Sequence, residues 1–175
     1  RANVFRVRLN GVLLGTYRGI NGRIFVYGFD GNDLINIQPK IRRSTYIDGG
    51  AGNDDLRGSS GHDVILGGDG DDRILGRAGR DLLIGGNGQD SIWGFAPSGY
   101  KGSPDGDIII GATTAIDDEM DTLFVALQQW VRKQTLTAIT EAQISGDGLI
   151  DILRVRRKLD LLFAEIDDQV VFIRP

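Results

Sequence analysis

Six aspartates recur at one position of a short repeated sequence, and their spacing gives them the clearest chemical potential in this 175-residue chain. Five copies of the nonapeptide run without interruption through residues 49–93, and a sixth stands at 28–36. Carboxylate oxygens are ligands that hard cations such as calcium prefer. The repeated aspartates are Asp33, Asp54, Asp63, Asp72, Asp81 and Asp90.

The elements that must position these carboxylates follow from the whole pattern, G-x-x-G-x-D-x-U-x. Its glycines, at positions 1 and 4 of every copy, permit positive φ and close approach of chain segments. The triplet x-U-x predicts one short strand with a single inward side chain. A strand this short cannot bury a core alone, whereas stacked copies can. The U residues are Ile35, Leu56, Ile65, Ile74, Leu83 and Ile92.

The repeat length predicts how the copies stack. With one strand and one turn per nonapeptide, two nonapeptides complete one coil, so turns eighteen residues apart become neighbours on the same side. We therefore predict an all-β fold, a parallel β-roll over residues 28–111, in which 94–111 form a degenerate end of the repeat.

These copies resemble the hemolysin-type calcium-binding repeat of the RTX (repeats-in-toxin) family, whose mark is G-G-x-G-x-D-x-U-x. The resemblance covers residues 28–36 and 49–93. It implies bound Ca²⁺, export of the unfolded chain through a type I channel, and folding outside the cell. The chain would then be a C-terminal fragment of a secreted or cell-surface bacterial protein, which agrees with its start at Arg rather than Met.

Calcium fits between stacked turns on distance grounds. Two oxygens facing each other across one ion lie roughly 4.6–5.2 Å apart, and neighbouring strands lie about 4.7–4.9 Å apart. The carboxylates supply charge and the carbonyls of the glycine turns supply further oxygens. The candidate metal-site residues are Asp54, Asp72, Asp90, Asp63, Asp81, Asp33, Gly49, Gly52, Gly67, Gly70, Gly85 and Gly88.

Because two nonapeptides complete one coil, the aspartates of alternate copies are expected on opposite sides of the roll. The first side holds Asp54, Asp72 and Asp90, and Asp33 joins it if residues 37–48 form one enlarged, calcium-free turn. We expect ions between turns 49–54 and 67–72 and between 67–72 and 85–90. A third, weaker site is expected between 28–33 and 49–54.

The second side, with Asp63 and Asp81, departs from the family pattern. Ser59 and Arg77 replace its second glycines, and Arg80 also lies next to Asp81. A guanidinium paired with Asp63 or Asp81 would take the place of an ion. We therefore predict that the first side binds calcium more tightly than the second.

Segments outside the repeats are expected to close the roll. Residues 1–27 read as a hairpin turning at Asn10-Gly11, followed by a strand at 23–27. We expect these strands to begin the stack and shield its first rung. After residue 93, Asp107 is a candidate residual ligand in the degenerate segment.

Residues 112–175 are expected to form a helix-containing cap or tail. Asp117 is a plausible N-cap, and an apolar stripe predicts a helix packed on the open end of the roll or against 136–144. Strands are expected at 160–163 and 170–173. The arrangement resembles the tails of RTX proteins, where a secretion signal often lies. The stripe consists of Met120, Leu123, Phe124, Leu127, Trp130 and Val131.

Composition argues against several other functions. The chain has no Cys and its net charge is −4, which equals the charge of residues 49–93 alone. It lacks a basic patch, a membrane-length apolar stretch, and the H-E-x-x-H and G-x-S-x-G motifs. Its only histidine, His62, is expected to be a solvent-facing turn residue. We predict no enzymatic activity, nucleic-acid partner or membrane span.

Two alternatives to a calcium-binding structural module stay open. The aspartates could serve the turns only, by accepting hydrogen bonds from the backbone. The roll could also be an adhesin or a polysaccharide-binding module, in which Trp93, Phe95 and Tyr100 contact a cell-surface polysaccharide or protein.

Overall fold

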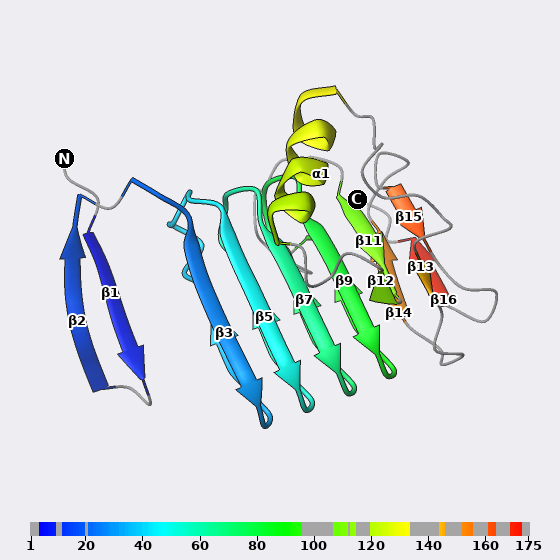
Figure 1. Cartoon of the computed structure of the whole chain (residues 1–175), viewed down its shortest axis with the longest axis horizontal. Coiled ribbons are helices and arrows are strands. Elements are labelled where there is room, and N and C mark those ends of the chain that lie inside the picture. Colours follow the sequence, from blue (N-terminus) through cyan, green and yellow to red (C-terminus); the bar gives the residue numbers. More distant parts are fainter. Residues whose placement is uncertain are drawn as a thin grey trace.

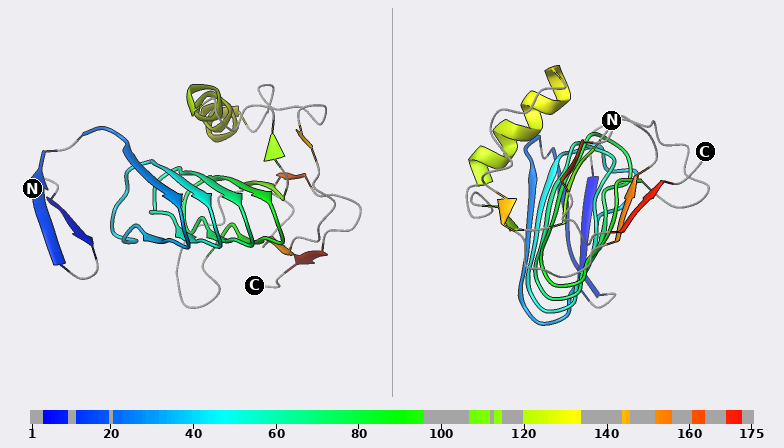
Figure 2. Two further views of the ribbon diagram at one scale, coloured as in Figure 1. Left: turned by 60° about the horizontal axis from the view of Figure 1, so that its bottom comes forward. Right: turned by 90° about the vertical axis from the view of Figure 1, so that its right-hand side faces the viewer.

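The computed structural model describes residues 4–9, 12–19, 21–95, 107–111, 113–114, 120–133, 144–145, 152–155, 161–163 and 169–172. From residue 24 onward the chain coils into a flattened roll of two facing parallel sheets, with one helix outside it (Figures 1 and 2). The predicted parallel β-roll is confirmed.

Successive strands alternate between the two sheets, as one strand per nonapeptide requires. The β3 sheet runs in the order β3 (Ile24–Asp30), β5 (Thr45–Ala51), β7 (Val64–Asp69), β9 (Leu82–Asn87), β11 (Ile108–Ile110) and β15 (Leu161–Phe163). The β4 sheet runs β4 (Leu34–Asn36), β6 (Asp55–Arg57), β8 (Arg73–Leu75), β10 (Ser91–Trp93), β14 (Ile152–Val155) and β16 (Gln169–Phe172). Neighbouring strands of the repeats pair eighteen residues apart, for example Leu56 with Ile74.

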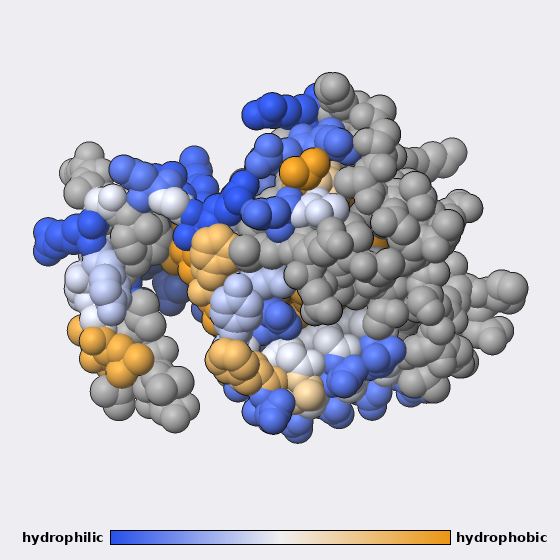
Figure 3. Space-filling model, viewed as in Figure 1, coloured by the Kyte–Doolittle hydropathy of each residue, from blue (hydrophilic) through white to orange (hydrophobic). Residues whose placement is uncertain are grey.

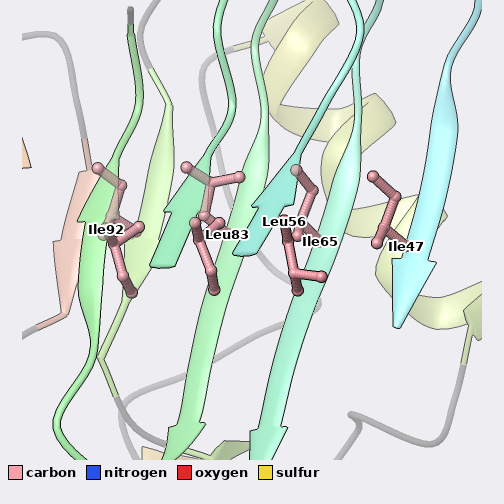
Figure 4. Close-up of a cluster of buried hydrophobic side chains, with 7 residues drawn as sticks. Ile47, Leu56, Ile65, Leu83 and Ile92 are labelled. Carbon is pink, nitrogen blue, oxygen red and sulfur yellow. The ribbon is translucent and has the colours of Figure 1, made fainter. Parts of the chain in front are cut away.

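The core lies between the sheets and consists of the repeated U residues (Figure 4). The rungs β5–β6, β7–β8 and β9–β10 each contribute one fully buried aliphatic side chain from each sheet, stacked on the neighbouring rungs. Burial of such a side chain stabilises the roll by about 1.5–3 kcal/mol. The cluster comprises Ile47, Leu56, Ile65, Ile74, Leu83, Ile92 and Ile109.

The β3 sheet is apolar on its outer face as well. Its strands read Val64-Ile65-Leu66 and Leu82-Leu83-Ile84, and all six side chains are buried. Helix α1 (Met120–Lys133) contacts β7 and lies over this sheet (Figures 1 and 2). The expectation that the helix packs on the open end of the roll is therefore wrong, because the second apolar face of the β3 sheet requires a cover.

Only part of the predicted helix stripe can be judged. Leu123 and Leu127 are buried, together with Ala126. The side chains of Met120, Phe124, Trp130 and Val131 lie outside the described set, as do Asp117 and the segment 136–143. The two predicted C-terminal strands are confirmed as β15 and β16, which continue the two sheets beyond the repeats.

The N-terminal hairpin forms, but it does not start the stack. Strands β1 (Val4–Leu9) and β2 (Val12–Arg18) pair only with each other, and β3 and β4 are the first strands of their sheets. The first rung is left open, with Phe29 73% and Leu34 69% exposed. Exposed apolar side chains therefore lie over β3 (Figure 3). The strand expected at 23–27 does begin its sheet as β3, whereas the expected shielding by the hairpin is wrong, because β1 and β2 pair only with each other.

Two short strands, β12 (Thr113–Thr114) and β13 (Ile144–Ser145), form a separate antiparallel pair. Among the described residues, no helix is long and apolar enough to cross a membrane.

Candidate metal centre

The first-side aspartates form a column along the roll axis. One carboxylate oxygen, Oδ1, of each aspartate accepts a hydrogen bond from the backbone N–H of the aspartate one coil earlier. The N–H of Asp33 donates to Asp54 (2.7 Å), that of Asp54 to Asp72 (2.8 Å) and that of Asp72 to Asp90 (2.9 Å). The structure thus brings together the four residues that the repeat spacing assigned to this side.

The other carboxylate oxygen, Oδ2, accepts no such backbone hydrogen bond in Asp33, Asp54 and Asp72. The Oδ2 atoms of Asp33, Asp54 and Asp72 are buried and accept no hydrogen bond from any described residue. Asp54 and Asp72 are only 2% and 1% exposed. A buried acceptor without a partner costs about 1–3 kcal/mol, and more when it is charged. These atoms therefore call for a cation or a proton.

Backbone carbonyls converge on the same places. A Cβ on Gly49 would come within 3.0 Å of both the Asp54 Oδ2 and the Gly67 carbonyl oxygen of the next coil. Gly67 stands in the same relation to the Asp72 Oδ2 and the Gly85 carbonyl. The position-1 glycine therefore leaves a space that is lined by a carboxylate oxygen and a carbonyl oxygen, which is a ligand set suited to calcium.

The position-4 glycines turn the chain into this space. Gly52, Gly70 and Gly88 have φ of 127°, 119° and 131°, which side-chain-bearing residues rarely adopt. Their N–H groups also join consecutive coils, as when Gly52 donates to the Asp69 carbonyl at 2.7 Å.

Burial changes the acidity of the column. Loss of solvation raises the pKa of Asp72 to about 7, and the hydrogen bond from Asp54 N–H opposes this rise only in part. The Asp54 pKa is also raised, first by burial and further by the nearby negative charge of Asp33. Without a cation, burial thus favours the protonated forms of Asp54 and Asp72.

Carboxylates alone do not complete a site. Among the described residues, no group of three or more His, Cys, Asp or Glu side chains converges. An ion between two coils would be held by one carboxylate oxygen from the column together with glycine carbonyls. Candidate donors on the first side are Asp54, Asp72 and Asp90 with the turns that begin at Gly49, Gly67 and Gly85.

The second side has its own column, and it extends further than the regular repeats. Thr45 N–H donates to Asp63 (2.8 Å), Asp63 to Asp81 (2.9 Å), and Asp81 to Asp107 (3.0 Å). Thr45 thus occupies the aspartate position in the enlarged turn, which provides no carboxylate there.

Asp107 is a regular member of this column despite its distance in sequence. A Cβ on Gly94 would meet the Asp107 Oδ2, as at the other position-1 glycines, and Ile109 completes the core. Residues 94–110 are therefore one repeat with an insertion between its first glycine and its aspartate. The sequence signal for this repeat was the triplet Ile108-Ile109-Ile110, which follows Asp107 as x-U-x follows the aspartate in the other copies.

Asp63 differs from the first-side aspartates because its second oxygen is occupied. Its Oδ2 accepts a hydrogen bond from the Ser59 N–H (2.6 Å). Burial raises the pKa of Asp63 to about 6, a rise that the donors from Thr45 and Ser59 moderate. The serine that replaces glycine thus takes part of the role of a cation.

Arginine on this side contacts carbonyl oxygens. The Arg77 guanidinium, expected to pair with Asp63 or Asp81, donates to the Gly58 carbonyl (2.6 Å) and to the Ile37 carbonyl. His62 is exposed as expected, and its Nδ1 accepts the Arg80 N–H. Trp93 and Phe95 are half-buried, and Tyr100 lies outside the described residues.

Comparison with known families agrees with this geometry. Residues 48–83 and 66–94 match the model of the RTX calcium-binding nonapeptide repeat (4 copies). No curated protein and no solved structure matches the chain.

Proposed function

We propose that this chain, an RTX-type calcium-binding repeat protein, holds calcium between the first-side turns and uses it to complete its own fold. The β-roll is a calcium-binding structural module. The proposed ions lie between turns 49–54 and 67–72 and between 67–72 and 85–90, with a weaker one between 28–33 and 49–54. The role is structural, with no catalytic step.

One observation carries this proposal: the buried Oδ2 atoms of Asp33, Asp54 and Asp72, which accept no hydrogen bond among the described residues. Turns that used aspartate only to hold the backbone would need Oδ1 alone. The remaining oxygen faces a glycine carbonyl of the next coil. A cation there would satisfy both atoms and neutralise the column, so its binding free energy would add to the folding free energy.

The test is a calcium titration of the chelated protein, followed by circular dichroism and thermal melting, with magnesium as the control. We expect a rise in melting temperature with calcium alone, because magnesium demands tighter octahedral geometry and retains its waters. A melting temperature that changes with neither chelator nor added calcium would contradict the proposal.

We further propose that the module works in a secreted or cell-surface protein. Extracellular calcium modules bind with dissociation constants of about 10⁻⁴–10⁻³ M. A site in that range would stay empty in the cytosol and fill outside the cell, so folding would follow export. A calcium dissociation constant far below this range would argue against such a switch.

An alternative function, binding of polysaccharide, is supported by aromatic residues on β3 rather than by the predicted cluster of Trp93, Phe95 and Tyr100. Phe25, Tyr27 and Phe29 form an exposed aromatic strip on β3, with rings of Tyr27 and Phe29 6.2 Å apart. Aromatic faces of this kind can stack on sugar rings. Glycan-array binding that is lost in Phe25→Ala/Tyr27→Ala but kept in Trp93→Ala would support this second function.

A further inference from the structure

The turns of the second side are joined by side chains of the protein itself. The Ser59 hydroxyl donates to the Arg43 carbonyl (2.8 Å), and the Ser60 hydroxyl donates to the Pro39 carbonyl (2.6 Å). Both bonds tie turn 58–63 to the enlarged turn at 37–44. On the first side the residues equivalent to Ser59 are glycines, and the side-chain bond between turns runs instead from Asn87 Nδ2 to Asp69 Oδ1 (2.8 Å).

Arg77 extends this connection by one more turn. From turn 76–81 its guanidinium reaches the Gly58 carbonyl in the preceding turn of the same side and the Ile37 carbonyl in the enlarged turn. It also donates to the Asn36 Oδ1 at 2.8 Å. One positive charge thus contacts oxygens from two other levels of the stack, which is what a bound ion does between turns.

The backbone of the second side is adapted to this side chain. On the first side, a Cβ on Gly68 would clash with the Gly50 carbonyl of the previous coil, so no side chain fits there. Arg77 occupies the equivalent position with φ of 81°, whereas Ser59 in the preceding turn has no positive φ. The altered turn at Ser59 therefore leaves room for the Arg77 side chain.

We propose that Arg77 is an internal cation that replaces calcium between turns 58–63 and 76–81, so that this part of the second side forms without metal. Ser59 satisfies the Asp63 carboxylate and Arg77 satisfies the neighbouring carbonyls. The roll then has a metal-binding first side and, on the second side, a metal-free gap between turns 58–63 and 76–81. This inference rests on the proposed function, since it distinguishes the second side from a first side that binds calcium.

The double variant Ser59→Gly/Arg77→Gly tests the inference, because it restores both missing glycines of the repeat. Native mass spectrometry of the whole chain in calcium counts the bound ions. We expect the variant to hold one more ion than the wild type. Arg80→Gly is the matched control: it removes the same charge from the same turn, and we expect it to bind the wild-type number.

The outcomes separate the two claims. Calcium uptake by the wild type with no additional ion in the double variant would overturn the inference and leave the proposed function standing. An additional ion in Arg80→Gly as well would show a general charge effect and would also overturn it. No uptake by the wild type would overturn the proposed function, and the inference with it.

Hydrogen exchange on the wild type provides a test that needs no variant to fold. In chelator, we expect amides of turn 58–63 to exchange at least tenfold more slowly than those of turns 49–54 and 67–72. Calcium should then slow exchange at the first-side turns while changing turn 58–63 little. Equal slowing of all turns by calcium would contradict a metal-free gap between turns 58–63 and 76–81.

Discussion

At the residue scale, Asp72 and Asp63 occupy the same repeat position but differ at their second carboxylate oxygen. We expect Asp72→Asn to weaken calcium binding by about tenfold or more, because it removes a charged ligand. We expect Asp63→Asn to leave calcium affinity unchanged and to cost about 1–3 kcal/mol of stability, because the Ser59 N–H loses its acceptor. Calorimetric titration and chemical denaturation measure the two effects. Equal losses of calcium affinity would show that both columns bind metal.

The acidity of Asp72 predicts how stability depends on pH. Burial raises its pKa to about 7 from 3.8, so the calcium-free fold holds this proton more tightly than the unfolded chain. The contribution of Asp72 to the free energy of unfolding in chelator should therefore be greatest below about pH 4 and fall by up to about 4 kcal/mol as the pH rises to 7. Calcium must displace the same proton, so its affinity should increase over that range. Melting curves from pH 4 to 8, with chelator and with calcium, check both trends.

At the scale of the single turn, position 2 shows why the stacked first-side turns use glycine. Gly68 has φ of 111° and lies against the Gly50 carbonyl, so Gly68→Ala adds both strain and a clash. We expect a loss of about 1–3 kcal/mol, with or without calcium. Phe29 has φ of 73° in the first rung, where no earlier coil supplies a carbonyl. Phe29→Gly should therefore be neutral or stabilise by about 1 kcal/mol. Denaturation midpoints of the two variants decide this, and a large loss in Phe29→Gly would contradict it.

The same elements show how far the sequence predicts the structure. Fixed glycine and aspartate spacing is local and repeated, so strand positions, parity and the core residues from Leu56 to Ile92 could be derived from it. The insertion after Gly94 hides the register of Asp107, which only the ladder from Asp81 restores. The position of α1 depends on an apolar outer face, and the triplets Val64-Ile65-Leu66 and Ile108-Ile109-Ile110 did carry that signal. The Arg77 contacts span about forty residues, and no local pattern encodes them.

At the scale of the whole molecule, metal and helix stabilise different parts of the roll. The proposed ions lie in the turns that follow β5, β7 and β9, whereas α1 lies over the strands towards their other ends (Figure 1). Helix burial and calcium binding should therefore contribute independently to stability. Mutations at sites this far apart, with no shared contacts, are expected to change the free energy of unfolding additively.

Truncation of the helix contact tests that independence. Leu123 and Leu127 are 0% and 2% exposed, so each change to Ala should cost about 2–5 kcal/mol. Val125 is 50% exposed on the same helix, and Val125→Ala should cost little, which makes it the matched control. We expect the loss in Leu127→Ala to be the same in chelator and in saturating calcium, because the helix provides no ligand. Denaturation of the three variants under both conditions gives the comparison. A loss that disappears when calcium is added would mean instead that the helix supports the metal-binding turns through the β3 sheet.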